Sequence, residues 1–166
     1  MKLPEELQTY FEPLAALQNL ISCFNQRGVV IGGIAASVLG NARYTEDLDA
    51  MFLLSTQDIP RFLEEAKQEG IEPRVENAAA FAKESRVLLL RHVITNTEID
   101  VSLGILPFEE EVIERSSIQE FDDSLRVAAS HPRRFANHES RRSSPEGPGG
   151  YSNPCSEIPQ PRHCPH

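Results

Sequence analysis

The sequence predicts an α+β fold, in which a small mixed β-sheet is flanked by helices and followed by a C-terminal tail. Stretches with helical spacing of apolar residues alternate with short β-rich runs between residues 1 and 130. Hydrophobic residues make up 40% of the chain and charged residues 25%, as in globular domains. The length of 166 residues is that of one ordinary domain. We therefore expect one core and one functional site within residues 1–130.

The first elements are predicted to be a helix, a buried strand and a short second helix. Residues 14–24 predict the first helix because their apolar side chains recur at intervals of three and four. Gly28 favours a helix stop, and the β-branched run 29–31 predicts a strand. Gly32-Gly33 then turns the chain into a short apolar helix over residues 34–39.

The middle of the chain predicts three more strands and one helix. Residues 47–54 alternate between polar and apolar and predict a second strand, and a helix is predicted from residue 58 to Gly70. Two β-rich runs follow, at 87–93 and 98–103, with Thr95-Asn96 between them. This pair of residues suits the tight turn of a hairpin.

The last predicted elements are a helix, one strand and the tail. Pro107, followed by Glu109, Glu110 and Glu111, predicts a helix with acid at its positive end, and residues 118–129 predict a final strand. Residues 131–166 contain no Leu, Val or Met but hold four of the five histidines and seven of the twelve prolines. Such a composition cannot offset the entropy cost of ordering. We interpret the segment as a disordered extension or as an aberrant end that arose from a rearranged gene.

Charge and cysteine content narrow the classes of function. The formal net charge is −9, and 11 basic against 22 acidic residues precede the tail. This acidic charge disfavours a protein that binds nucleic acid over a broad surface. It is compatible with a localised RNA-binding site in which a metal ion screens the phosphates. The three cysteines lack CxxC spacing, so neither a disulfide framework nor a structural zinc site is indicated, and we expect Cys23 to be in the core.

The sequence gives no sign of a membrane segment. No run approaches the roughly 20 apolar residues that a bilayer span needs. The chain opens with Met1-Lys2-Leu3-Pro4-Glu5-Glu6, which lacks the basic-then-apolar order of a secretion signal. We therefore expect a cytoplasmic protein without a membrane partner.

Three aspartates are the candidate catalytic and metal-binding residues. Because side chains alternate along a strand, Asp47 and Asp49 are expected on the same face, where their like charges favour a divalent cation between them. In the run 98–103, Asp100 falls on the face opposite to its apolar neighbours. If the two strands adjoin, the three carboxylates can hold two metal ions, as in phosphoryl transfer.

A phosphate-binding element is predicted beside these acids. The turn at Gly32-Gly33 lets the backbone approach phosphate oxygens closely. Arg43 is suited to neutralise phosphate charge, and Thr45 to hydrogen-bond a phosphate oxygen. Each of these residues also has a less specific interpretation. Gly32-Gly33 can form a plain turn, and Arg43 can form a surface ion pair with Glu46. His92 can be packed or solvated instead of acting as a ligand.

The order of these residues resembles the signature of the nucleotidyltransferase superfamily, in which a glycine pair precedes a strand with two acids. The resemblance is strongest to the AbiEii-type toxin-like nucleotidyltransferases, whose pattern is Gly-Gly-x-Ala, Gly, Arg-x-Thr-x-Asp-Leu-Asp. The chain reproduces it with Gly32, Gly33, Ala35, Gly40, Arg43, Thr45, Asp47 and Asp49. The resemblance is specific mainly across residues 28–54, and residues 98–101 match the third-acid strand less sharply.

The resemblance implies a mixed sheet flanked by helices, a nucleoside triphosphate with Mg²⁺ or Mn²⁺, and transfer of a nucleotidyl group to a hydroxyl acceptor. Asp47 and Asp49 would hold the metal ions, and Asp100 would complete the site or act as the base. Relatives in toxin–antitoxin pairs act on RNA ends and are restrained by a partner. An RNA acceptor and an antitoxin protein are therefore expected partners.

One departure from the family supports an alternative. Relatives continue past the equivalent of residues 126–128 into helices that include a phosphate-binding lysine, whereas every lysine here, Lys2, Lys67 and Lys83, lies earlier. The main alternative is therefore a non-catalytic or degenerate interaction module that retains the fold. Two other classes of protein fit the sequence less well. A dinucleotide-binding protein would need Gly-x-Gly-x-x-Gly spacing, which residues 29–33 lack. A glycosyltransferase could also use an Asp-x-Asp pair to hold a metal ion, but the chain is short for that class.

Overall fold

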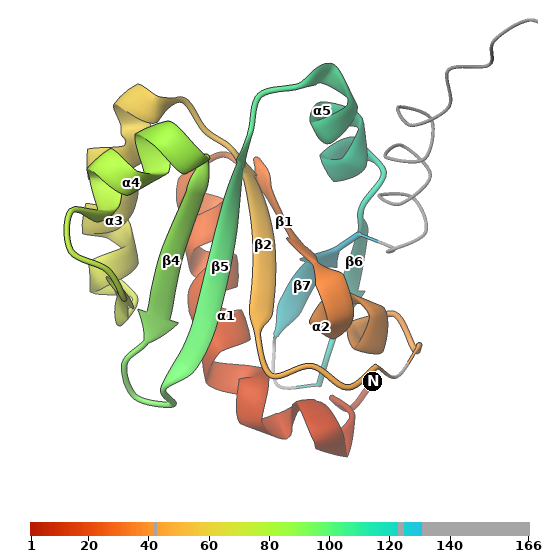
Figure 1. Cartoon of the computed structure of the whole chain (residues 1–166). Coiled ribbons are helices and arrows are strands. Elements are labelled where there is room, and N and C mark those ends of the chain that lie inside the picture. Colours follow the sequence, from red (N-terminus) through yellow and green to blue (C-terminus); the bar gives the residue numbers. More distant parts are fainter. Residues whose placement is uncertain (42, 123–124, 131–166) are drawn as a thin grey trace, which may run out of the picture.

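The structure, a computed structural model, describes residues 1–41, 43–122 and 125–130 (Figure 1). The predicted tail at 131–166 lies outside the described residues. The helices are η1 (Glu5–Tyr10), α1 (Phe11–Cys23), α2 (Gly32–Val38), η2 (Thr56–Asp58), α3 (Ile59–Gln68), α4 (Ala78–Ser85) and α5 (Pro107–Glu114). The strands are β1 (Gly28–Ile31), β2 (Leu48–Leu53), β3 (Ile71–Pro73), β4 (Val87–His92), β5 (Thr97–Gly104), β6 (Ser117–Glu120) and β7 (Arg126–Ala129).

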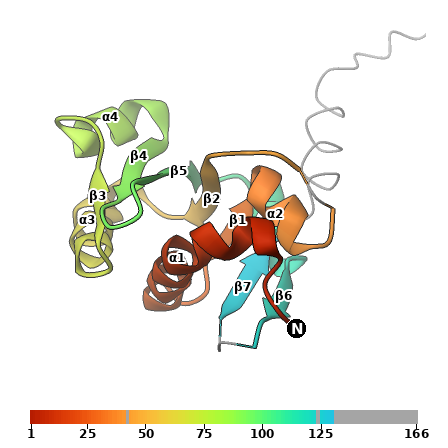
Figure 2. The same cartoon turned by 90° about the horizontal axis from the view of Figure 1, so that it is seen from below.

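The strands of the described residues form one mixed sheet of seven strands in the order β3-β4-β5-β2-β1-β7-β6. β2 runs parallel to β5, and β1 runs parallel to β7, whereas the other neighbours are antiparallel. Figure 2 shows β3, α3 and α4 at one end of the sheet and β6 and β7 at the other. The α+β class with a mixed sheet and flanking helices is therefore confirmed.

One face of the sheet carries the main hydrophobic core. Alternate residues of the central strands point into it, and α1 covers them with its own apolar side. Phe62 of α3 packs edge-on against Phe52 of β2, with ring centroids 4.9 Å apart, so both rings are fully buried. This burial fixes which side chains of β2 and β5 face away from the core.

The opposite face of the sheet is only partly covered. Val112 of α5 packs there with Val29 and Met51 in a second, smaller apolar cluster. Figure 1 shows α5 over one end of this face and α2 near the other. The polar positions of β2 and β5 lie on this same side, because they alternate with the residues of the main core.

Most predicted elements are confirmed, with bounds that differ by a few residues. The predicted single strand at 118–129 was wrong, because the chain turns back after β6 and returns as β7, antiparallel to it. The sequence reasoning did not identify β3 and α4. The strand β3 has three residues, too few for an alternation to show, and half of the residues of α4 are alanine, which leaves little apolar pattern.

Two placements near the ends of elements also needed correction. The first helix ends at Cys23, so Gly28 begins the next strand instead of stopping the helix. Cys23 is exposed and not in the core, because the buried side of α1 contains Leu17, Leu20 and Ile21, and residue 23 faces away from it.

Within the described part of the chain, no helix is both long and apolar enough to cross a bilayer.

Candidate functional site

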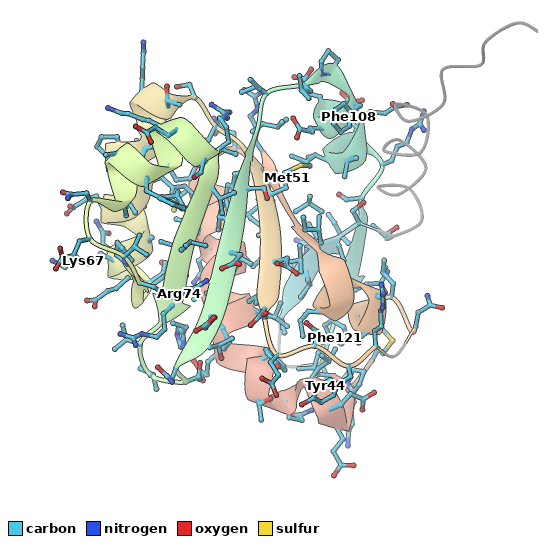
Figure 3. All side chains as sticks on the ribbon, in the orientation of Figure 1. Tyr44, Met51, Lys67, Arg74, Phe108 and Phe121 are labelled. Atoms are coloured by element: carbon cyan, nitrogen blue, oxygen red, sulfur yellow. The ribbon has the colours of Figure 1, made fainter. Side chains whose placement is uncertain are left out.

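Asp49 and Asp100 are direct neighbours on the less covered face of the sheet. The parallel pairing of β2 with β5 places Asp49 opposite Asp100, as it places Leu48 opposite Ile99. Leu48 and Ile99 are fully buried in the main core, so the two aspartates point to the other face, where both are partly buried. The condition that their two strands adjoin is therefore met. Met51 and Arg74 mark this face in Figure 3.

The glycine turn lies directly against the Asp49 carboxylate. Gly32 has φ +72°, a conformation that side chains rarely adopt, and it begins α2 directly after β1, the strand that pairs with β2. A β-carbon on Gly32 would overlap with Asp49 Oδ2, and one on Gly33 would lie 2.7 Å from Thr45 Cγ2. The two glycines therefore permit a close approach of backbone to the acid and to the loop before β2.

Asp47 lies next to the strand rather than in it. The strand begins at Leu48, so Asp47 occupies the preceding bend and is exposed, and the predicted strand start at residue 47 was wrong. The Tyr10 hydroxyl steadies this bend by donating to the carbonyl oxygens of Thr45 (3.1 Å) and Glu46 (3.2 Å). Asp47 is near enough to Asp49 to contribute to the raised pKa of its carboxyl.

Arg74 is a site residue that sequence reasoning missed. Its guanidinium pairs with Asp100 Oδ1, and its Nη1 lies 3.2 Å from Glu98 Oε2. Arg74 directly follows the short strand β3, and its Nε donates to the carbonyl oxygen of Leu90 (3.0 Å). The only sequence signal was a single basic residue among Glu69, Glu72 and Glu76, which does not specify a partner.

The two paired aspartates have different electrostatic surroundings. Burial raises the pKa of the Asp49 carboxyl above its ordinary value, and the nearby charges of Asp100 and Asp47 raise it further. Among the described residues, no basic side chain forms an ion pair with Asp49, whereas Asp100 has the Arg74 guanidinium. Asp49 is therefore the member of this pair that has no basic partner among the described residues.

This donor set fits a divalent cation in part. Carboxylate oxygens are what Mg²⁺ and Mn²⁺ prefer, and the like charges of Asp47 and Asp49 favour a cation between them. In the described ranges, however, no group of three or more His, Cys, Asp or Glu side chains is arranged to hold a metal ion. Because Arg74 binds Asp100, the fit rests on Asp47 and Asp49, and the role of Asp100 as a ligand stays a prediction.

The loop before β2 carries the other predicted binding residues. Arg43 is exposed, and its backbone is tied to α2 because its N–H donates to Ser37 Oγ (3.1 Å). Glu46 accepts the Tyr44 hydroxyl at 2.7 Å, and within the described residues Arg43 forms no ion pair with it. The Thr45 hydroxyl donates to the Asp47 carbonyl oxygen (3.3 Å). The loop therefore leaves the Arg43 guanidinium available to a ligand.

The structure also shows the position of His92 and of two grooves. His92 is buried, and its Nδ1 lies 2.9 Å from Thr95 Oγ1, which confirms that it packs within the hairpin. A groove of about 640 Å³ is lined by Asp47 and Glu98, but neither Asp49 nor Asp100 lines it. A larger groove of about 790 Å³ lies between α1 and the β6–β7 hairpin, but none of the site carboxylates lines it.

The chain matches no protein-family model and no curated protein sequence.

The raised pKa of Asp49 predicts an effect on stability in the absence of divalent ions. The folded protein holds this proton more tightly than the unfolded chain does, so stability falls as pH rises through the raised pKa. Asp49→Asn removes the effect, and we expect it to raise the free energy of unfolding at neutral pH by about 0.5–2 kcal/mol. Urea titrations at acid and neutral pH measure this. Equal or lower stability of the variant at neutral pH would contradict the account.

The Gly32 contact predicts that two left-handed glycines differ in their tolerance of alanine. Gly40 has φ +85° but nothing within 4 Å of its would-be β-carbon, so Gly40→Ala should lower stability by about 1–2 kcal/mol through backbone strain alone. Gly32→Ala adds the overlap with Asp49 and should cost at least about 1 kcal/mol more. Thermal unfolding of both variants provides the comparison, and equal losses would argue against the close approach at Gly32.

Proposed function

We propose that this chain is a metal-dependent nucleotidyltransferase that moves a nucleotidyl group from a nucleoside triphosphate to a hydroxyl acceptor. The observation that carries the proposal is the in-register pair Asp49 and Asp100, on an incompletely covered sheet face, directly against the Gly32 turn. We propose the nucleotidyltransferase fold on the same grounds, because the family resemblance implies a glycine pair beside a strand with two acids and, less sharply, a third acid on a later strand.

The residues of the site have distinct proposed roles. Asp47 and Asp49 would hold Mg²⁺ or Mn²⁺, which when bound neutralises triphosphate charge and lowers the pKa of a coordinated hydroxyl. The backbone at Gly32-Gly33 would lie along the phosphates, and Thr45 would orient them. Arg43 has a free guanidinium within the described residues and would pair with phosphate oxygens.

The proposed reaction is a displacement at the α-phosphorus. The acceptor hydroxyl oxygen forms a bond to phosphorus, the bond to the β-phosphate oxygen breaks, and pyrophosphate leaves. The hydroxyl proton would pass to a carboxylate of the site that does not hold the metal ion. An RNA hydroxyl as the acceptor, and an antitoxin protein as a partner, rest on the family resemblance alone.

A second candidate is a non-catalytic module that retains the fold. Two observations favour it: Arg74 already neutralises Asp100, and no three-residue metal group is present within the described residues. The two candidates differ in what they bind. Only the enzyme requires a divalent ion and a triphosphate at Asp49.

We predict that Mg²⁺ or Mn²⁺ together with a nucleoside triphosphate raises the thermal midpoint of the protein. A ligand at about 100 times its Kd adds about 2.7 kcal/mol to stability. Asp49→Asn should abolish the rise, whereas Glu64→Gln, which makes the same charge change on the exposed side of α3, should keep it. Differential scanning fluorimetry with each of the four ribonucleoside triphosphates tests this. The absence of a shift with every triphosphate would favour the non-catalytic module.

Transfer itself is measured by incubating the protein with α-³²P-labelled triphosphates, Mg²⁺ and total RNA. Label should move to RNA with the wild type and with Glu64→Gln, but not with Asp49→Asn. Binding of a triphosphate without transfer to any RNA would place the acceptor in another class of molecule.

A further inference from the structure

Tyr44 carries the most exposed large hydrophobic side chain of the described residues. It lies on the loop that leads into β2, where Figure 3 labels it, and 90% of the residue is exposed. The fold gains little from an aromatic ring that stays in water. Single exposed hydrophobic side chains are common on protein surfaces, so the surroundings of this ring decide whether it has a use.

The ring is held by its neighbours on the loop. The Tyr44 hydroxyl donates to Glu46 Oε1 at 2.7 Å. The Tyr10 hydroxyl fixes the following backbone by donating to the carbonyl oxygens of Thr45 (3.1 Å) and Glu46 (3.2 Å). On the other side, the backbone N–H of Arg43 donates to a serine hydroxyl of α2 (3.1 Å). A ring that is fixed in this way loses little conformational freedom when a flat ligand stacks on it.

A groove of about 570 Å³ runs along the loop, between η1 and α2. Arg43, Tyr44 and Thr45 line it from the loop, and Ile34 lines it from α2. The groove adjoins the glycine turn through Thr45, because a β-carbon on Gly33 would overlap with the Thr45 side chain. It thus connects the exposed ring to Arg43 and Thr45, the two residues of the loop that were predicted to bind phosphate.

The charges along the groove limit what it can hold. Of the described residues that line it, Arg43 is the one cationic side chain, and it forms no ion pair within the described part of the chain. One guanidinium beside one open ring face suits a ligand in which a phosphate group and an aromatic base are close together. Glu6 and Glu46 also line the groove, and their charges disfavour a long RNA backbone along it.

We infer that the base of the nucleoside triphosphate stacks on the Tyr44 ring in this groove, while Arg43 pairs with its phosphate oxygens. The identity of the ligand rests on the proposed function. The role of Tyr44 is an addition to the family pattern, in which the residue between the arginine and the threonine is unspecified. Because every base has a π-face, stacking on Tyr44 strengthens the binding of all four ribonucleoside triphosphates.

Proton NMR of the full chain tests the contact directly. The ring signals of Tyr44 are assigned by their loss in Tyr44→Ala. They should move upfield when a ribonucleoside triphosphate with Mg²⁺ is added, because a stacked base shields them. They should stay in place with Mg²⁺ and inorganic tripolyphosphate, which has no base. Signals that stay in place with all four triphosphates, or that move only with a 5′-hydroxyl oligoribonucleotide, would overturn the inference.

Isothermal titration calorimetry measures what the ring adds to affinity. Tyr44→Ala should weaken the binding of each triphosphate by about tenfold, as the loss of one base stack predicts, and leave that of tripolyphosphate unchanged. Tyr44→Phe keeps the ring and should bind like the wild type. Phe81→Ala is the matched control, because Phe81 is the other exposed aromatic residue of the described chain and lies on α4, outside the groove.

Two calorimetric results would contradict the stacking. One is equal affinity of the wild type and Tyr44→Ala for every triphosphate. The other is an equal loss of affinity for triphosphates and for tripolyphosphate in Tyr44→Ala, because it indicates a disturbed loop and not a lost stack.

Failure of the proposed function gives a different result. If the Tyr44 ring responds to triphosphates but no label moves to any acceptor, the stacking stands and the transfer reaction falls. If Tyr44→Ala transfers label with an unchanged KM for the triphosphate, the proposed function stands and the stacking alone is overturned. If the wild type binds no triphosphate, both fall.

Discussion

The pairing register of β2 with β5 is the constraint on which the rest of the site depends. Leu48 and Ile99 are both fully buried in the core, and this burial holds the two strands in one alignment. Because side chains alternate, the same alignment sends Asp49 and Asp100 together to the opposite face. A slip by one residue would move a carboxylate into the core, so the hydrophobic core itself enforces the meeting of the acids.

The two acids meet at the expense of stability, and the chain compensates only one of them. Arg74 gives Asp100 a fixed counter-charge, whereas Asp49 lies against the Gly32 turn with a pKa raised by burial and by neighbouring charge. A partly buried, uncompensated carboxylate beside a backbone that approaches it closely is typical of a site that is completed by a ligand. This asymmetry supports the proposed activity.

The sequence was sufficient for the central strands and for the glycine turn, because their periodicity and their order along the chain are local properties. The alternation in 98–103 also indicated the face of Asp100, but its approach to Asp49 depended on whether the two strands adjoin. The sequence could not supply Arg74, whose role depends on β3, a three-residue strand at the edge of the sheet. The ion pairs of Arg74 with Glu98 and Asp100 are long-range contacts, and no local pattern encodes them.

The most direct test of the convergence is a carboxyl ¹³C NMR titration of Asp49 in the metal-free protein, for the wild type and for Asp100→Asn. If the two carboxylates share one face, the pKa of Asp49 lies above its ordinary value in the wild type and falls in the variant, because a neighbouring negative charge is gone and Arg74 is released. An ordinary pKa that Asp100→Asn leaves unchanged would contradict the account.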